Sequence, residues 1–416
     1  MKKVVCLLIC ALVLLPLLAS CSGKDDGEVT GGAVTLYVYN WGEYISDGSE
    51  GSLDVNEAFE EYCRQTLHKN VKVNYSTYSS NEDLYAKISS KAISYDVIFP
   101  SDYMVARLAA EGLIQKYDPK TTIENYGNID ERFTGLYYDP GEEYSVAYTY
   151  GTIGVIYNTA MVSEDNEHIG SWSLLWDEEY SGNILQFNNP RDAFGTAQFY
   201  NKTSANSDSE EEWRAALEKL KEQKLIVQGY VMDEVFNKMK GGSAAIAPYY
   251  AGDFLTMYAD NEDLAFYHPE EGTNVFVDAM CIPSSSENVE LAREYINFML
   301  TEEIAIENAE YICYASPNRL VYENEEYAEY MNGEVHPDAM TILYDFDMGS
   351  MEFYHDLPDD TRKLLNDLWE ELKIESDIGI AIYVICGIII AGLAAFFIAR
   401  FVIKRRRAYY FNKYAV

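Results

Sequence analysis

The segment AVTLYVYNWGEYI (33–45) carries the pattern that decides the fold. Residues 34–39 form an apolar run with the length of a buried strand, and polar and aromatic residues follow it directly. Residues 71–75 and 97–99 predict two further strands, and the segments between the strands have the apolar spacing of helices. This alternation predicts an α/β fold with a mixed, mostly parallel sheet that helices cover on both faces.

Capping residues predict where the first helices begin and end. Asp54 precedes an apolar stripe, and Glu57 follows three residues later, which is an acidic analogue of the capping box. Ser80 begins a second helix in the same way. A third helix runs to about Glu111 and ends at Gly112, because glycine readily adopts the left-handed conformation that follows a helix.

The alternation continues through the rest of the chain. Further strands are predicted at 153–157, 184–187, 244–247 and 275–282. Further helices are predicted at 210–222 (capped by Ser209), 290–300, 302–310 and 360–373. About 350 residues lie between the two ends of the chain, which are too many for one compact core and indicate two domains.

The N-terminus has the pattern of a secretory signal peptide over residues 1–20. Lys2 and Lys3 precede an apolar run at 4–18, and small residues follow it before Cys21. The sequence LASC (18–21) resembles the bacterial lipobox, so we expect Cys21 to carry a lipid and residues 21–32 to form a flexible tether. The alternative is an ordinary signal peptide followed by a chance cysteine.

The C-terminus predicts a second membrane anchor. Residues 378–399 contain no charged side chain, and as a helix they would extend about 33 Å, enough for a bilayer core of about 30 Å. Arg400 and the basic run 404–407 follow, so the positive-inside rule places the tail in the cytoplasm. We therefore expect a transmembrane helix at 378–403, a cytoplasmic tail at 404–416 and an exterior domain on the outer face of the bacterial cytoplasmic membrane. A buried core helix is the alternative.

Composition limits the classes of partner. The chain has 31 basic and 68 acidic residues and a net charge of −37. Such a field repels nucleic acid and attracts cations, although an acidic, well-solvated surface explains the same composition.

Cysteine spacing predicts neither a metal site nor a full set of disulfides. Four of the seven cysteines lie in the signal peptide, at the lipid site or in the membrane segment. The remaining three cannot all pair, and we expect buried free thiols, with their redox state left open. They are Cys63, Cys281 and Cys313.

Aromatic and acidic residues recur where the predicted strands end, which is where ligands bind in open parallel sheets. The segments are NWGEY (40–44), PSDY (100–103), NNPRD (188–192) and PYY (248–250). Asp278 lies inside an apolar strand and needs a partner, either a ligand cation or backbone amides. Carboxylates and hydroxyls suit the ammonium ends of an alkyl diamine, and ring faces suit its cations and methylenes.

Several segments together resemble the spermidine/putrescine-binding proteins of polyamine ABC transporters, which have the type II periplasmic-binding-protein fold. The resemblance covers residues 35–372. It rests on YNWGEYI (39–45), YSTYSSNEDLYAKI (75–88), YDVIFPSDYMVARLAAEGLIQKYD (95–118), YGT (150–152), SWSLLW (171–176), YYAGD (249–253), VDAMCIP (277–283), INFML (296–300) and YASPN (314–318).

The resemblance implies two lobes with the ligand between them. Lobe 1 would comprise 33–147 and 276–320, and lobe 2 would comprise 148–275 and 321–374. Extended crossovers at 145–148 and 272–275 would act as the hinge. The implied ligand contacts are Trp41, Glu43, Tyr44, Ser101, Tyr103, Asn189, Asp192, Tyr249, Phe276, Asp278, Tyr314 and Tyr354.

By the same resemblance, Asp278 grips an ammonium group, and Tyr249, Phe276 and Tyr314 form aromatic walls. The chain departs from the family pattern at Gly42, where a side chain is usual, and at Asn189, which replaces an acid. Tyrosine or phenylalanine also stands where tryptophan is frequent. The missing acid leaves spermidine and putrescine as alternatives, and the membrane tail is unusual for the family.

The implied function is that of a substrate-binding receptor, without cofactor or catalysis, which delivers a polyamine to an ABC permease as a monomer. Another small cation or a metal complex bound by the same fold is an alternative, as is a sensory or adhesive ectodomain. A surface hydrolase is the alternative from another class, since abundant carboxylates include possible glycosidase pairs. The sequence contains no G-x-S-x-G, H-E-x-x-H or phosphate-loop motif, and its five histidines are scattered.

Overall fold

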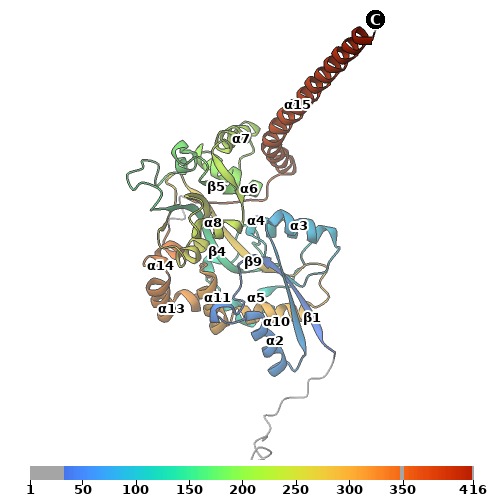
Figure 1. Cartoon of the computed structure of the whole chain (residues 1–416). Coiled ribbons are helices and arrows are strands. Elements are labelled where there is room, and N and C mark those ends of the chain that lie inside the picture. Colours follow the sequence, from blue (N-terminus) through green and yellow to red (C-terminus); the bar gives the residue numbers. More distant parts are fainter. Residues whose placement is uncertain (1–31, 347–350, 415–416) are drawn as a thin grey trace, which may run out of the picture. The chain divides into compact units, whose positions relative to one another are not determined.

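The computed structural model describes residues 32–346 and 351–414, apart from the side chains of residues 50, 374–385 and 407–414. The predicted signal peptide (1–20), the lipid site at Cys21 and all of the tether but its last residue lie outside the described residues. The chain forms two compact units (Figure 1). Unit 1 comprises Met1–Gly151 and Phe276–Phe346, and unit 2 comprises Thr152–Val275 and Asp347–Val416.

Unit 1 contains a sheet with the strand order β2-β1-β3-β9. Strand β1 (Val34–Trp41) is parallel to β2 (Val71–Tyr78) and β3 (Val97–Ile98), and β3 pairs antiparallel with β9 (Thr273–Cys281). Its longer helices are α2 (Val55–Gln65), α3 (Asn81–Ser90), α4 (Asp102–Ala110), α10 (Val289–Met299) and α11 (Glu302–Ile312). Its shorter helices are α5 (Pro119–Thr122), α12 (Arg319–Tyr322), α13 (Glu325–Tyr330) and α14 (Ala339–Tyr344).

The predicted helix ends of unit 1 are confirmed. The carboxylate of Asp54 accepts a hydrogen bond from the Glu57 amide at 2.9 Å, and the Ser80 hydroxyl accepts one from the Asp83 amide at 3.1 Å. Helix α4 ends as expected before Gly112, whose φ of 66° lies in the left-handed region.

Unit 2 contains a sheet with the order β4-β7-β5-β6. Strand β5 (Ile184–Phe187) is parallel to β6 (Val227–Val231) and β7 (Ile246–Tyr250), while β4 (Ser145–Asn158) is antiparallel to β7 and β8 (Leu264–Tyr267). The short strand β10 (Met351–Phe353) is parallel to the start of β9. Unit 2 also contains the helices α6 (Pro190–Tyr200), α7 (Glu210–Lys224), α8 (Glu234–Lys240) and α9 (Ala251–Tyr258). The predicted fold class, with mixed and mostly parallel sheets, is therefore confirmed.

The chain changes units inside two long strands. The first change falls between Gly151 and Thr152 in β4, and the second falls between Val275 and Phe276 in β9. The first boundary lies four residues after the predicted one, because the extended strand begins at Ser145 and still belongs to unit 1 for half of its length.

Residues 321–346, which we placed in lobe 2, belong to unit 1 in the structure. Their aromatic side chains explain this placement. The Tyr344 hydroxyl accepts a hydrogen bond from the Ser316 amide at 3.1 Å, and its oxygen lies 3.2 Å from that of Tyr327, which is fully buried. The ring of Tyr344 also meets the edge of Tyr150, with 6.1 Å between centroids. Burial of these rings against unit 1 stabilises the segment there.

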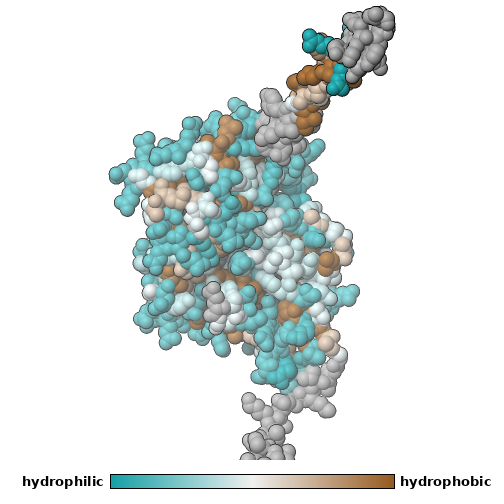
Figure 2. All heavy atoms as spheres, in the orientation of Figure 1, coloured by the Kyte–Doolittle hydropathy of each residue, from teal (hydrophilic) through white to brown (hydrophobic). Residues whose placement is uncertain are grey.

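Helix α15 (Asp359–Tyr414) joins the two helices predicted at 360–373 and 378–403 into one. Its first part buries Leu368 and Leu372 in unit 2, and Glu371 forms an ion pair of 2.8 Å with Lys221 of α7. Its later part, Cys386–Arg406, is apolar and exposed, and by length and composition it could cross a membrane (Figure 2).

Close packing between strands of unit 2 yields a stability prediction. A Cβ added to Gly154 in β4 would lie 2.3 Å from the Phe266 ring and 2.6 Å from the Tyr267 carbonyl oxygen, whereas one added to Gly229 in β6 would have no atom within 4 Å. We expect Gly154→Ala to lower the free energy of unfolding by about 1–3 kcal/mol or more through overpacking. Gly229→Ala is the matched control and should change it little. Urea unfolding of both variants measures the difference, and equal stabilities would contradict this packing.

Candidate ligand-binding site

The carboxylate of Asp278, on β9 of unit 1, is held by two hydroxyl groups. Its Oδ2 atom accepts a hydrogen bond from Tyr44 at 2.7 Å, and its Oδ1 atom accepts one from Ser101 at 2.6 Å. Asp278 is only 3% exposed, so these bonds replace much of the water that an ionised carboxylate would lose on burial. The sequence indicated that Asp278 needs a partner. The structure provides two, Tyr44 and Ser101, which follow the first and third strands.

Tyr44 is itself fixed by its surroundings. Its hydroxyl lies 2.5 Å from the Thr149 hydroxyl, and the Tyr148 hydroxyl donates to its carbonyl oxygen at 2.8 Å. The Tyr314 ring meets it edge to face at a centroid distance of 4.6 Å. Burial, followed by the negative charge of Asp278, raises the pKa of Tyr44 well above its usual value. Tyr44 thus remains a neutral hydrogen-bond donor beside the carboxylate.

Ser101 is oriented by a residue that the sequence analysis missed. The Asn81 amide nitrogen donates to the Ser101 hydroxyl at 3.0 Å, and the Ser101 main-chain amide donates to the Asn81 carbonyl at 3.2 Å. This leaves the Ser101 hydroxyl free to donate its proton to Asp278. The position of Asn81, directly after the predicted cap Ser80, was the signal available in the sequence.

A second aspartate, Asp102, is bonded to the residue that precedes Asp278 in β9. Asp102, at the start of α4, is fully buried and accepts hydrogen bonds from the main-chain amides of Tyr103 at 2.7 Å and Val277 at 3.3 Å. Burial raises the pKa of Asp102 well above its usual value, and the charge of Asp278 contributes in the same direction. The protonated form of Asp102 is therefore favoured beside the Asp278 carboxylate.

The structure places the aromatic residues of unit 1 in different settings. Phe276 lies over Gly151, where an added Cβ would be 2.8 Å from its ring, and its centroid is 6.4 Å from that of Tyr314. The indole nitrogen of Trp41 donates to the Phe99 carbonyl at 2.9 Å, and its ring packs against that of Tyr78 with 4.6 Å between centroids. Glu43 is exposed and has a φ of 50°.

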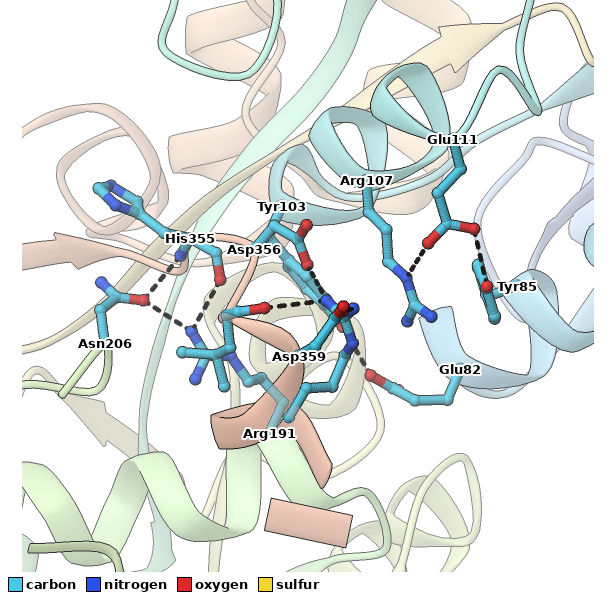
Figure 3. Close-up of polar contacts among 12 residues, drawn as sticks. Glu82, Tyr85, Tyr103, Arg107, Glu111, Arg191, Asn206, His355, Asp356 and Asp359 are labelled. Carbon is cyan, nitrogen blue, oxygen red and sulfur yellow. Dashed lines mark hydrogen bonds and ion pairs between the residues drawn. The ribbon is translucent and has the colours of Figure 1, made fainter. Parts of the chain in front are cut away.

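Tyr103 belongs to a polar group on α3 and α4 (Figure 3). Its hydroxyl donates to Glu82 at 3.2 Å, and nearby the Arg107 guanidinium stacks 3.4 Å from the centroid of the Tyr85 ring. Arg107 also forms an ion pair of 3.0 Å with Glu111. The bond to Glu82 joins Tyr103 of α4 to α3.

In unit 2, Asn189 and Asp192 form a closed pair at the start of α6. Asn189 is the N-cap residue, and its side-chain oxygen accepts from the Asp192 amide at 2.8 Å. Its side-chain nitrogen donates to Asp192 Oδ2, also at 2.8 Å. Asn189 therefore caps the helix and orients the carboxylate at the same time.

Tyr250 is the second donor to Asp192 and was not predicted. Its hydroxyl donates to Oδ2 at 2.6 Å. Burial raises the pKa of Asp192 above its usual value, although the hydrogen bonds from Tyr250 and Asn189 and the charge of Arg191 oppose the shift. The signal in the sequence is the Tyr-Tyr pair at 249–250, of which the family resemblance implies Tyr249 as the ligand contact.

Tyr249 is 2% exposed and stacks on Phe187 with 5.5 Å between centroids, so it belongs to the core of unit 2. Tyr354 is also buried, and the guanidinium of Arg191 lies 4.4 Å from the centroid of its ring. Arg191 donates to Asn206 and to the His355 carbonyl, as Figure 3 shows.

Each unit thus brings one buried carboxylate together with neutral donors. Asp278 is grouped with Tyr44 and Ser101, and Asp192 with Asn189 and Tyr250. A carboxylate is a strong acceptor of charge-assisted hydrogen bonds from an ammonium group.

Comparison with known proteins identifies the family. Residues 57–333 match the family model of bacterial extracellular solute-binding proteins. The chain belongs to this family. The spermidine/putrescine-binding periplasmic protein of Salmonella typhimurium is 32% identical over 309 residues, which cover 74% of this chain and 84% of that protein. This finding confirms the resemblance seen in the sequence.

Further relatives of this solute-binding protein include a putrescine-binding periplasmic protein of Pseudomonas aeruginosa, 27% identical over 81% of this chain and 91% of that protein. Among solved structures, a spermidine/putrescine ABC transporter protein from Listeria monocytogenes aligns with a TM-score of 0.71 at 31% identity, covering 82% of this chain and 99% of its own. The corresponding substrate-binding protein of Streptococcus pneumoniae gives 0.63 at 31% identity, covering 82% and 98%.

The raised pKa of Asp102 predicts how stability depends on pH. The folded state holds this proton at pH values where the unfolded state releases it, so its stabilising effect is complete below about pH 3.9 and is lost as the pH rises toward the folded-state pKa. Asp102→Asn removes this loss. The free energy of unfolding of the variant should therefore rise relative to the parent, by at most about 1.4 kcal/mol per pH unit. Urea unfolding across this range measures the difference, and a constant difference would contradict the assignment.

Proposed function

We propose that this solute-binding protein is the substrate receptor of an ABC importer for polyamines such as putrescine and spermidine. The observation that carries this proposal is the pair of buried carboxylates, one in each unit, held by hydroxyl and amide donors among aromatic rings. Ammonium groups are the natural partners of such carboxylates. The similarity to a spermidine/putrescine-binding protein and to a putrescine-binding protein supports the same ligand class.

In this proposal each unit carries its own group for an ammonium ion. Asp278, with Tyr44 and Ser101, receives one ammonium group, and Asp192 receives another. Aromatic faces cover the methylene chain and stabilise the cations. We assign this role to Trp41, Tyr103, Phe276 and Tyr314, while Glu43 adds negative charge at the first strand end, and Asn189, Tyr249 and Tyr354 support the site from within unit 2.

Ligand capture requires no covalent step and no cofactor. A polyamine that contacts both units favours a closed arrangement only to the extent that it binds that arrangement more tightly. The extended strands β4 and β9, in which the chain changes units, are suited to act as the hinge. A permease could then distinguish loaded from empty receptor.

We further propose that the receptor is monomeric and is anchored to the outer face of the cytoplasmic membrane. A lipid on Cys21 would hold the N-terminus, residues 378–403 would cross the bilayer, and the basic tail 404–416 would lie in the cytoplasm. The exposed apolar stretch Cys386–Arg406 of α15 supports the second anchor. Anchoring would raise the effective concentration of the receptor near its permease.

Calorimetry on Asp278→Asn tests the proposed function. Putrescine and spermidine should bind the parent, and the variant should lose about 3–5 kcal/mol of binding free energy, because one partner of a desolvated charge pair is removed. The loss should appear for both amines.

Asp102→Asn is the matched control, since Asp102 is also buried but does not pair with an ammonium group of the ligand in this proposal. It should retain most of the parent's affinity. A parent that binds neither amine, or an Asp278→Asn variant with the parent's affinity, would contradict the assignment.

A further inference from the structure

The last turn of α7 is fixed to the part of α15 that precedes the apolar stretch. The Lys224 ammonium donates to the Leu372 carbonyl, and Lys221 forms an ion pair of 2.8 Å with Glu371. Leu372 itself is fully buried in unit 2. Helix α7 and the first part of α15 therefore lie side by side within unit 2 (Figure 1). The end of α7 is thus held where α15 leaves the core of this unit.

Chain length keeps this point close to the membrane segment proposed at 378–403. Ile378 follows Lys373 by five positions. In the continuous helix α15 these residues rise about 7.5 Å, and even a fully extended chain would span at most about 18 Å. The headgroup layer on each side of a bilayer is about 5–7 Å thick. If residues 378–403 cross the bilayer, the end of α7 lies within reach of the headgroups.

The turn after α7 exposes an apolar side chain at this place. Leu225 is 85% exposed, more than Ile388 in the apolar stretch of α15, which is 67% exposed. A single exposed leucine is ordinary on a protein surface, so its position and support are what matter. The Leu225 amide donates to the Glu222 carbonyl at 3.3 Å. The carbonyl of the next residue, Ile226, accepts from the Gly182 amide at 2.7 Å. Hydrogen bonds on both sides therefore hold the turn that presents Leu225.

Lysine side chains flank Leu225, and acidic side chains near it are paired with them. Lys219 forms an ion pair of 2.7 Å with Glu222, and Lys221 forms one of 3.2 Å with Glu218. The whole chain has a net charge of −37, and an acidic surface is repelled by anionic headgroups. Here an ammonium group lies beside each of these two carboxylates. Lysine can place its ammonium among phosphates while its methylene groups stay near hydrocarbon.

We propose that the turn after α7 is a membrane-docking edge, in which Leu225 enters the headgroup layer of the phospholipid bilayer and the flanking Lys221 and Lys224 meet lipid phosphates. The proposal rests on the proposed transmembrane anchor and adds a second contact to it, which limits the rotation of unit 2 about α15. The occupant is the bilayer rather than another protein, because the short connection to 378–403 brings lipid to this edge in every copy of the receptor.

Leu225→Trp tests the contact, because tryptophan is itself suited to the membrane interface. The full chain is reconstituted into vesicles of phosphatidylcholine and phosphatidylglycerol, with and without bromine on the acyl chains. The emission that Leu225→Trp adds to that of the parent's five tryptophans should lie at shorter wavelength and should be quenched by the brominated lipid. Met161→Trp is the matched control, since Met161 is an apolar residue, 39% exposed, in another turn of unit 2. Its added emission should be neither shifted nor quenched.

Hydrogen exchange of the full chain in the same vesicles provides a second measurement. Leu225→Gln removes the apolar side chain without adding a charge at the end of α7. Residues 218–230 should exchange faster in this variant than in the parent, because the contact that protects them from local opening is lost. Residues 159–166, which surround Met161, should exchange at the parent's rate.

The outcomes separate the docking edge from the anchor. Quenching no greater in Leu225→Trp than in Met161→Trp, or unchanged exchange in Leu225→Gln, would overturn the docking edge and leave the anchor in place. A shift to shorter wavelength without quenching would mean that protein covers Leu225, and it would overturn the proposal too. A chain that does not float with the vesicles would contradict the transmembrane anchor itself and the docking edge with it.

Discussion

The burial of the Asp278 carboxylate is the constraint on which the organisation of unit 1 depends. An ionised carboxylate without hydrogen-bond partners would be strongly destabilising at 3% exposure. Its two donors come from Tyr44 and Ser101, which follow the first and third strands, while Asp278 itself lies on β9. The Asp278 carboxylate thereby joins three segments that are far apart in the sequence. Burial raises the pKa of the neighbouring Asp102, with a contribution from the charge of Asp278, and so disfavours a second charge beside Asp278.

Unit 2 also surrounds a buried carboxylate with neutral hydrogen-bond donors, but the residues differ. Asp192 lies at the start of α6, where a cap residue and a tyrosine hydroxyl replace the serine and tyrosine of unit 1. The residue before the cap, Asn188, accepts a hydrogen bond from Lys373 of α15. The carboxylate site and the helix that continues into the apolar stretch Cys386–Arg406 are thus neighbours in the structure. A membrane anchor of this kind would be connected directly to the unit that carries Asp192.

Local signals in the sequence predicted much of the fold. The caps Asp54, Ser80 and Ser209 were predictable because each bonds to an amide three residues away. Strand ends were predictable from apolar runs, and they led to Ser101, Tyr44 and Asp192, whereas Asp278 was recognisable as an acid inside an apolar strand. Tyr250 and Asn81 were missed because their roles depend on contacts with residues distant in sequence or on another element. The assignment of 321–346 to unit 1 rests on aromatic contacts of Tyr344, which no periodic pattern reveals.

We propose that the two supported carboxylates, Asp278 and Asp192, bind a polyamine. Native mass spectrometry of the full chain, released from detergent with its co-purifying small molecule, is the decisive measurement. We expect a one-to-one complex whose released ligand has the mass of a diamine or triamine, and we expect this complex to be lost in Asp278→Asn. A bound sugar, anion or ferric complex, or an amine complex that persists unchanged in that variant, would contradict it.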